Sequence, residues 1–371
     1  MNPERITAAL ADAFSRCDAV FLSGGLGPTC DDLTKETVAE FFSLPLYEDK
    51  YTLSRIERYF ADVGRPMPEN NRKQALVPAG AVIFDNDNGT APGLAVEKDG
   101  KTAVLLPGPP VEIEPLWYEK VEDYLRPRTD GIIVSHNVHV INLGESAAEE
   151  ILRDLMTSGT NPTLAPYAKD GEVRLRVSAR AANRAEADAL CLGMIEKVKA
   201  TEVGKYIYGI DAGSTENALV GLLRERGMTL AAAESCTGGM LAERVTALPG
   251  CSDVFLGCCV TYANSAKIGL VGVSPETLAA HGAVSAETAA EMARGARLAL
   301  GASMGLATTG IAGPGGGTPE KPVGTVFVAV STEKGETVKK LSMSPLRSRA
   351  YIRYSSCTQA FGLGIAALKN K

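Results

Sequence analysis

The sequence predicts an α/β protein that folds as two or three domains. Its 371 residues exceed the length of one typical domain. Short apolar runs alternate along the chain with stretches in which apolar residues recur at helical spacing. The 38 glycines and 20 prolines suit the many tight turns of such a fold, and a hydrophobic content of 45% can fill several cores. We therefore expect sheets covered by helices.

Composition also limits location and function. No apolar run approaches the length of a membrane span, and the first residues enter an amphipathic helix without a signal-peptide pattern. The eight cysteines lack paired Cys-x-x-Cys spacing, so we expect free thiols in a reducing cytoplasm, no zinc site and no membrane contact.

The charge is distributed unevenly along the chain. From residue 214 onward, there are fifteen Lys and Arg and eleven Asp and Glu, a balance of +4. The preceding part has twenty-three against thirty-three, a balance of −10. A weakly basic domain favours an anionic substrate but does not predict nucleic-acid binding.

The first part of the chain contains a candidate phosphate-binding loop. A short buried strand at residues 19–22 leads into Ser23-Gly24-Gly25-Leu26-Gly27-Pro28-Thr29, and a helix follows. This order of strand, glycine-rich loop and helix can cradle a phosphate. Asp31 and Asp32 would repel a bare phosphate, which makes a divalent cation the natural bridge. An acidic helix N-terminus, favoured by the helix dipole, explains the two aspartates equally well.

Two more turns rich in glycine and proline follow in the same part of the chain. A helix is predicted over residues 51–63, and Gly89-Thr90-Ala91-Pro92-Gly93 comes after it. A hairpin about Asp99-Gly100 leads to a strand at residues 103–106, which ends in Pro107-Gly108-Pro109-Pro110. Strands that end in such turns predict a ligand crevice at the carboxyl edge of a parallel sheet.

The middle of the chain, about residues 121–210, predicts a small module with one solvent-facing sheet surface. Strands are expected at 132–142 and at 172–178, where apolar and polar residues alternate strictly, and helices at 146–155 and 185–198. Arg174 and Arg176 share a strand face and could contact RNA. A solvated face is the favoured interpretation, because no aromatic residues stand between them and the segment has no Gly-x-x-Gly loop. Residues 205–213 are interpreted as a linker.

The last part of the chain again alternates strands and helices. Ser214 or Thr215 is expected to cap its first helix. The remaining elements are expected as strands at 228–233, 254–262 (buried) and 304–309, a helix at 285–300, a hairpin of 322–332 with 337–343, and a final helix carrying Arg349 and Arg353. This pattern predicts a compact α/β sandwich.

Ala233 to Gly239 forms the most informative stretch of this last part. The pattern predicts an apolar strand, then a sharp turn that contains Ser235, Cys236 and Thr237, and then a helix. A nucleophile in such a turn gains positive potential and backbone N–H donors from the helix start. Two other strand ends are expected nearby: Tyr262 with Lys267, and the glycine-rich loop at residues 310–318.

These residues favour acyl transfer to a serine and hydrolysis of an amide. The only histidine of this part, His281, does not stand where it would pair with Ser235, so a Ser-His-Asp triad is disfavoured. Lys267 is the remaining base, provided that its pKa is depressed, and Tyr262 could orient it or relay a proton. Three alternatives stay open. Ser235 could be a plain helix cap, Lys267 a solvated surface lysine, or Cys236 the nucleophile.

Three motifs resemble the C-terminal domain of the CinA (competence/damage-inducible) family. They are Glu234-Ser235-Cys236-Thr237-Gly238-Gly239, Thr261-Tyr262-Ala263-Asn264-Ser265-Ala266-Lys267, and Gly310-Ile311-Ala312-Gly313-Pro314 with Pro322-Val323-Gly324-Thr325-Val326. The resemblance implies a cofactor-free nicotinamide mononucleotide deamidase of NAD salvage, with Ser235 as nucleophile and Lys267 and Tyr262 completing the site. Substrate binding is assigned to Thr237, Gly238, Gly239, Thr309, Gly310, Gly313, Gly316, Arg349 and Arg353. The family's usual Tyr-Ser-Asn reads Tyr-Ala-Asn here.

The first part resembles the family's N-terminal domain, which has the fold of molybdopterin-binding proteins. In some members this domain hydrolyses ADP-ribose with a divalent metal. The resemblance assigns Gly24, Gly25, Gly27, Thr29, Asn71, Gly89, Thr90 and Gly108 to a nucleotide site, and Asp31 and Asp32 to the metal. Family members usually begin with a further strand-loop-helix unit, so we expect one strand and part of the pocket to be absent and do not predict pyrophosphatase activity.

The expected organisation is therefore a molybdopterin-binding-like α/β domain at residues 1–122, a KH-like middle module at 123–210 and the deamidase domain at 211–371. We expect a cytoplasmic homodimer that hydrolyses nicotinamide mononucleotide to nicotinate mononucleotide and ammonia, with ADP-ribose as a second candidate ligand. The alternative is a non-catalytic, nucleotide-binding adaptor associated with competence. RNA binding by the middle module is a third and weaker option.

Overall fold

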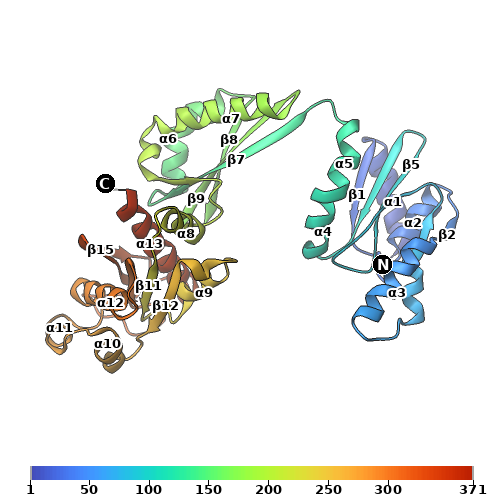
Figure 1. The fold of residues 1–371 in the computed structure, drawn as a ribbon. Helices are drawn as coiled ribbons and strands as arrows, with labels where there is room; N and C mark the ends of the chain where they lie inside the picture. Colours follow the sequence, from blue (N-terminus) through green and yellow to red (C-terminus); the bar gives the residue numbers. More distant parts are fainter. Residues whose placement is uncertain (1, 370–371) are drawn as a thin grey trace. The chain divides into compact units, whose positions relative to one another are not determined.

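The computed structural model describes residues 2–369. The chain forms two compact units that divide between Asp130 and Gly131, and each is described by itself (Figure 1). The first unit contains a four-stranded sheet in the order β1-β6-β5-β4. Strand β1 (Ala19–Ser23) is parallel to β6 (Lys101–Leu106), whereas β5 (Gly93–Lys98) and β4 (Val82–Phe84) continue the sheet in antiparallel fashion. The loop before β5 therefore lies at the same edge as the ends of β1 and β6.

Helices cover both faces of this sheet. Helices α1 (Pro3–Phe14) and α2 (Thr34–Phe41) contribute Leu10 and Val38 to a core with Leu105 of β6, while α4 (Pro110–Leu116) packs on the opposite face through Leu116. The remaining elements of this unit are α3 (Lys50–Asp62), α5 (Glu122–Leu125), and a small sheet of β2 (Leu46–Glu48) with β3 (Leu76–Pro78). The expected burial of the first strand is wrong. Among the described residues β1 pairs only with β6, and Phe21 is 47% exposed at this edge.

The second unit begins with an antiparallel sheet in the order β10-β7-β9-β8. Its strands are β7 (Ile132–Ile141), β8 (Thr163–Lys169), β9 (Glu172–Ala181) and β10 (Ile207–Ile210), with α6 (Glu145–Thr157) and α7 (Arg184–Lys199) packed against one face. The linker interpretation of residues 205–213 is wrong, because 207–210 pair with β7 as an edge strand. The guanidinium of Arg174 lies 5.0 Å from the centre of the ring of Tyr167 on the neighbouring strand. This aromatic contact was not expected, because Tyr167 does not lie within the sequence segment of the two arginines.

The rest of the second unit is a three-layer α/β sandwich built on a sheet in the order β12-β11-β13-β14-β15. Strand β11 (Leu230–Glu234) lies between β12 (Phe255–Val260) and β13 (Met304–Gly310), parallel to both, and β14 (Thr325–Thr332) and β15 (Gly335–Ser342) are antiparallel. Helix α12 (Ala286–Ala299) covers one face, and α8 (Thr215–Glu225), α9 (Met240–Thr246) and α13 (Arg349–Lys369) cover the other. The expected α/β fold class is thus confirmed.

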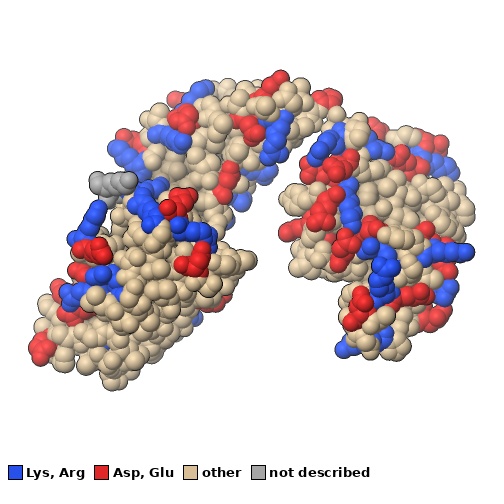
Figure 2. Space-filling model, viewed as in Figure 1, with Lys and Arg blue, Asp and Glu red and all other residues tan. Residues whose placement is uncertain are grey.

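Strand β12 is not the buried strand that its apolar sequence predicts. It pairs only with β11, so it forms an edge of the sheet, and Leu256 and Val260 are 44% and 47% exposed. On the face drawn in Figure 2, positive and negative side chains are interspersed over both units, while the surface around α10 (Asn264–Val271) carries few charges. Within residues 2–369, no helix has the length and apolar character needed to cross a membrane.

Candidate active site

The Ser235 turn joins the end of the central parallel strand to a short helix. Strand β11 ends at Glu234, and α9 begins at Met240. Gly238 and Gly239 have positive φ angles of +59° and +99°, which residues with a side chain rarely adopt. These two glycines let the chain reverse sharply into α9. Ser235 is half-buried at the tip of the strand.

Lys267 lies beside Ser235 although 32 residues separate them in the chain. Helix α10 carries the lysine back under the end of β12, and its side chain is 1% exposed. Its Nζ donates to Ser235 Oγ (3.2 Å), to the carbonyl oxygen of Thr261 (2.8 Å) and to that of Tyr262 (3.3 Å). Burial lowers the pKa of Lys267 below its usual range. A lysine that loses its proton more readily can act as a base toward a neighbouring hydroxyl.

Cys236 turns away from this pair. Its side chain is 6% exposed and packs in the hydrophobic core beneath α9 and α13. Burial, the largest effect, raises the pKa of the Cys236 thiol to about 12, and the Glu234 carboxylate acts in the same direction. A thiol in this environment stays protonated near neutral pH, so the geometry favours Ser235 over Cys236.

The backbone N–H groups of the turn are less available than the strand-turn-helix pattern suggests. The N–H of Ser235 donates to Thr308 O (2.9 Å), and that of Gly238 donates to Ser235 O (3.2 Å). The N–H groups of Cys236 and Thr237 make no hydrogen bond to another residue in the part of the chain that the structure describes. These two donors follow the serine directly, so they are the ones left for an oxyanion.

Glu234 takes the other N–H groups at the start of α9, a role that sequence reasoning missed. Its buried carboxylate accepts hydrogen bonds from the N–H groups of Gly239, Leu241 and Ala242. The expectation that free helix N–H groups point outward here is therefore wrong for this part of the turn. One signal was present in the sequence: a charged residue closes an otherwise apolar strand, directly before the serine.

Tyr262 contacts the site in two ways. Its carbonyl oxygen accepts the hydrogen bond from Lys267, but its side chain is 61% exposed. The phenol oxygen accepts a hydrogen bond from Arg349 (3.2 Å) and makes no hydrogen bond to Lys267 among the described residues. The ring therefore lies at the rim of the site, where it can meet a substrate.

The two arginines of α13 reach the same edge of the sheet. Arg349 donates to Gly313 O (2.7 Å) as well as to Tyr262, and Arg353 donates to Thr237 O (2.6 Å). They connect the nucleophile turn, the glycine-rich loop and the tyrosine. Both side chains place positive charge beside the nucleophile turn and the glycine-rich loop, an arrangement that suits an anionic group.

The other assigned residues are spread around this edge. Thr237 is fully buried and its hydroxyl bonds to that of Thr308 (2.6 Å), while the hydroxyl of Thr309 donates to Ala283 O (2.6 Å). Gly310 has no room for a side chain, since a Cβ would lie 2.6 Å from Val326 Cγ2. Gly316 lies on the exposed part of the glycine-rich loop.

The predicted nucleotide site of the first unit coincides in part with a cavity. Its lining includes Gly24, Gly25, Gly27, Asp32, Thr90 and Gly108, together with Gln74 and Glu112, which sequence reasoning did not single out. Thr29, Asp31, Asn71 and Gly89 are not part of this lining. The hydroxyl of Thr29 donates to the carboxylates of Asp31 and Asp32. Within residues 2–369 no group of three or more His, Cys, Asp or Glu side chains is arranged to hold a metal ion.

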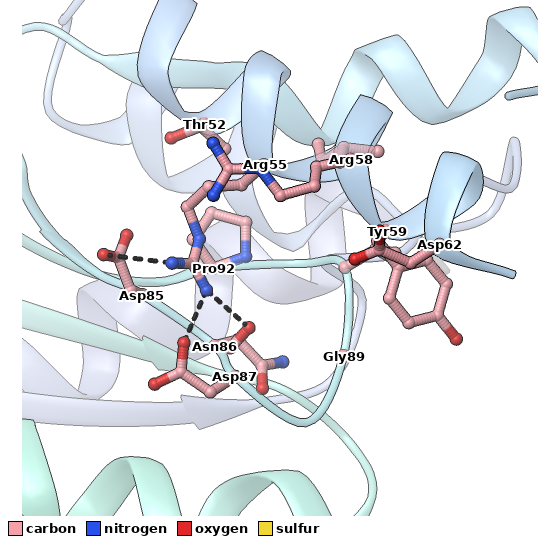
Figure 3. A pocket seen from close by; sticks show the side chains of 12 residues that line it. Thr52, Arg55, Arg58, Tyr59, Asp62, Asp85, Asn86, Asp87, Gly89 and Pro92 are labelled. Carbon is pink, nitrogen blue, oxygen red and sulfur yellow. Dashed lines mark hydrogen bonds and ion pairs between the residues drawn. The ribbon is translucent and has the colours of Figure 1, made fainter.

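A second cavity shares Thr90 with the first and is also lined by Gly89 (Figure 3). Arg55 of α3 crosses it and forms ion pairs with Asp87 (2.6 Å) and Asp85 (3.5 Å). Lys120 also pairs with Asp87 (2.7 Å). These contacts neutralise most of the charge in the cavity. They hold the loop that carries Gly89 and Thr90 in place beside the predicted nucleotide site.

Family models match the chain in three consecutive segments. Residues 2–127 match a probable molybdopterin binding domain, 135–209 the damage-inducible protein CinA KH domain, and 213–367 the CinA C-terminal domain. A competence-damage inducible protein of Caldanaerobacter subterraneus is 47% identical over 362 residues, which cover 98% of this chain and 87% of the relative. The chain belongs to the CinA family. The expected three-part architecture is thereby confirmed.

Other CinA relatives are similar over most of their length. A competence-damage inducible protein of Moorella thermoacetica is 50% identical over 89% of this chain and 80% of its own, and a CinA-like protein of Kosmotoga olearia is 44% identical over 94% and 84%. A solved structure of the competence/damage inducible protein CihA from Agrobacterium tumefaciens is 38% identical and covers 42% of this chain and 94% of its own, with a TM-score of 0.40.

Proposed function

We propose that this CinA protein is an amidohydrolase that converts nicotinamide mononucleotide to nicotinate mononucleotide and ammonia. The observation that supports this most is the 3.2 Å contact between Ser235 Oγ and the Nζ of Lys267, a lysine whose pKa burial lowers. A buried lysine without a carboxylate partner within hydrogen-bond distance is costly to keep charged. A neutral amine beside a serine hydroxyl is the arrangement of a Ser–Lys hydrolase.

The proposed reaction has two stages. Neutral Lys267 takes the proton of Ser235 as Oγ attacks the carboxamide carbon, and the negative charge on the carboxamide oxygen is met by the N–H groups of Cys236 and Thr237. The C–N bond then breaks, the lysine returns its proton to the leaving nitrogen, and ammonia departs from an acyl-serine. A water molecule, deprotonated by the same lysine, attacks the acyl carbon. This step releases the carboxylate product and restores Ser235.

The substrate class is suggested by the arginines rather than by the serine. Arg349 and Arg353 lie beside the nucleophile turn and the glycine-rich loop, so an anionic group attached to the amide can be held there. A mononucleotide carries such a phosphate in the same molecule as its carboxamide. Tyr262, exposed at the rim, offers a ring face to the nicotinamide or ribose.

Ammonia release tests this function directly. The purified full chain should release ammonia from nicotinamide mononucleotide, and Ser235→Ala should not. Ser252→Ala is the matched control and should keep full activity, because it changes an exposed serine before β12, at the end of the sheet opposite to Ser235. Ammonia at the level of the Ser235→Ala protein would exclude the proposal.

A second function, nucleotide binding by the first unit, is favoured by its glycine-lined cavity. Asp32 and Glu112 line it, and the Oε1 of Gln74 is buried without a hydrogen-bond partner among the described residues. Carboxylate and amide oxygens fit a magnesium ion that is shared with phosphate groups. Binding of ADP-ribose that requires magnesium, measured by calorimetry, would support this role. Binding without turnover would favour the adaptor alternative for this unit.

A further inference from the structure

Glu234 is a fully buried carboxylate at the centre of the candidate active site. It is 0% exposed at the end of β11, the strand that carries Ser235. Its Oε2 accepts hydrogen bonds from the N–H groups of Gly239 (2.9 Å) and Leu241 (3.0 Å). Its Oε1 accepts one from the N–H of Ala242 (2.9 Å) and one from the thiol of Cys258 (3.4 Å). A carboxylate so deeply buried needs such donors, because burial without them would cost several kcal/mol, on the order of 2–7 even for a neutral polar group.

This carboxylate replaces the side-chain cap that a helix normally has. The residue before α9 is Gly239, which has no side chain, and α9 has no other side-chain cap at that position. Glu234 reaches it from the preceding strand instead. Residues 235–238 are thereby closed into a short loop that is fixed at both ends. The negative charge also suits the positive end of the helix dipole.

The backbone of Glu234 supports the other member of the pair. Its carbonyl oxygen accepts a hydrogen bond from the N–H of Thr261 (2.7 Å). The carbonyl oxygen of Thr261 in turn accepts the shortest hydrogen bond of Lys267 Nζ (2.8 Å). Ser235 and Lys267 are thus both held by bonds that begin at Glu234, one through its side chain and one through its main chain.

We propose that Glu234 is a positioning residue of the reaction, whose carboxylate fixes the Ser235 turn against Lys267. This inference rests on the proposed hydrolase function. The carboxylate also occupies the N–H groups of residues 239, 241 and 242, so that only those of Cys236 and Thr237 remain for the oxyanion. A displacement of about 1 Å at a reacting atom can lower a rate about 100-fold.

The variant Glu234→Gln tests the role of the carboxylate with little change of shape. The amide has one accepting oxygen and places its NH₂ group against a backbone N–H, so at least one of the three hydrogen bonds from backbone N–H groups is lost. We expect kcat to fall about 100-fold and KM to change less than about threefold. The matched control is Glu291→Gln. Glu291 also accepts a backbone N–H at a helix start, that of Ser274 (2.8 Å), away from the Ser235 turn.

Both variants should lower the melting temperature, but only Glu234→Gln should lower kcat per folded molecule. Unchanged kcat in Glu234→Gln, or a loss confined to KM, would overturn the proposal. If Glu234→Gln does not fold, amide exchange in the unaltered protein decides. The N–H of Gly239, which lies outside the helix, should then exchange with solvent far more slowly than that of Thr237. Equal exchange rates of these two N–H groups would contradict the proposed capping by Glu234.

A readout without nicotinamide mononucleotide separates this inference from the proposed function. A fluorophosphonate reacts with an activated serine whatever the natural substrate, and intact mass shows the added group. If the protein does not hydrolyse nicotinamide mononucleotide, the proposed amidohydrolase function is excluded. The positioning role is then still supported if Glu234→Gln labels about 10-fold or more slowly than the unaltered protein. Equal labelling of the two would contradict it.

Discussion

The Nζ of Lys267 lies 3.2 Å from the Oγ of Ser235, and the lysine is 1% exposed. The two residues reach each other because β11 and β12 are parallel neighbours whose carboxyl ends meet at one edge of the sheet. The Nζ of Lys267 also donates to the backbone carbonyl oxygens of Thr261 and Tyr262, and within residues 2–369 it makes no hydrogen bond to a carboxylate. The environment thus favours a neutral lysine beside a serine.

The first prediction concerns the two side chains of this pair. Ser235→Ala and Lys267→Ala should each lower kcat for ammonia release by about 10³-fold or more, because each removes one partner of a single proton transfer. The double variant should lose little beyond either single one. Cys236→Ala should keep kcat within about tenfold, since the thiol faces the core. The opposite ranking, with Cys236→Ala inactive and Ser235→Ala active, would move the nucleophile to the thiol.

The second prediction is the pH dependence of kcat/KM. The base acts only when neutral, so activity should rise with pH as Lys267 loses its proton. Burial lowers the pKa of Lys267 from its ordinary 10.5, so this rise should be centred below pH 10.5. Lys267→Arg stays charged at every accessible pH and should be inactive throughout. An activity rise centred at or above pH 10.5 would show that Lys267 is not the base.

Much of the fold follows from local sequence pattern. The alternation of apolar runs and helical periodicity in the last 160 or so residues predicts the sandwich, because strand and helix periods differ. Ser214 caps α8 as expected, its hydroxyl accepting the N–H of Asn217 (3.3 Å). The turn at Lys334-Gly335 also lies where the sequence places it. These features depend on neighbours within a few residues.

The features that sequence reasoning missed depend on partners far along the chain. Strand β12 is apolar but lies at an edge, and β10 is a strand because β7 is available to pair with it. The Glu234 carboxylate lies on a strand and caps the helix that follows, so the capping motifs known from helix N-termini do not predict it. Strand order is set by tertiary packing, which composition and periodicity do not encode.

The third prediction concerns recognition of the substrate phosphate by Arg349 and Arg353. Arg349→Ala should raise KM for nicotinamide mononucleotide about 10- to 100-fold, the loss typical of charge-assisted hydrogen bonds. Nicotinamide riboside lacks the phosphate, so Arg349→Ala should raise the KM for this compound much less. Arg353→Ala should lower kcat in addition, because it removes the hydrogen bond from Arg353 to Thr237 O. Equal effects of Arg349→Ala on both compounds would contradict phosphate binding there. Arg347→Ala is a suitable control, because its guanidinium lies over the Tyr351 ring instead.

The fourth prediction concerns His136 of β7 and the stability of the middle module. Its Nδ1 lies 2.6 Å from Asp211 and its Nε2 lies 3.0 Å from Asp188. The hydrogen bonds with Asp211, the larger effect, and with Asp188 raise the pKa of His136 above its ordinary value. A raised pKa means that the charged imidazole stabilises the folded state. This contribution is complete below the unfolded pKa, about 6.5, and is lost as the pH rises through the higher folded value.

His136→Gln should therefore reduce stability more at pH 5.5 than at pH 9, measured as the difference in melting temperature from the unaltered protein. Amide exchange within β7 and β9 assigns the effect to this module, because the chain has several domains and one melting temperature can mix them. His281→Gln is the matched control. That imidazole is about half exposed, with its nearest carboxylate, Glu287, 3.7 Å away, so its replacement should change stability little at either pH. A His136→Gln loss of equal size at pH 5.5 and pH 9 would show that packing, and not charge, is what His136 contributes.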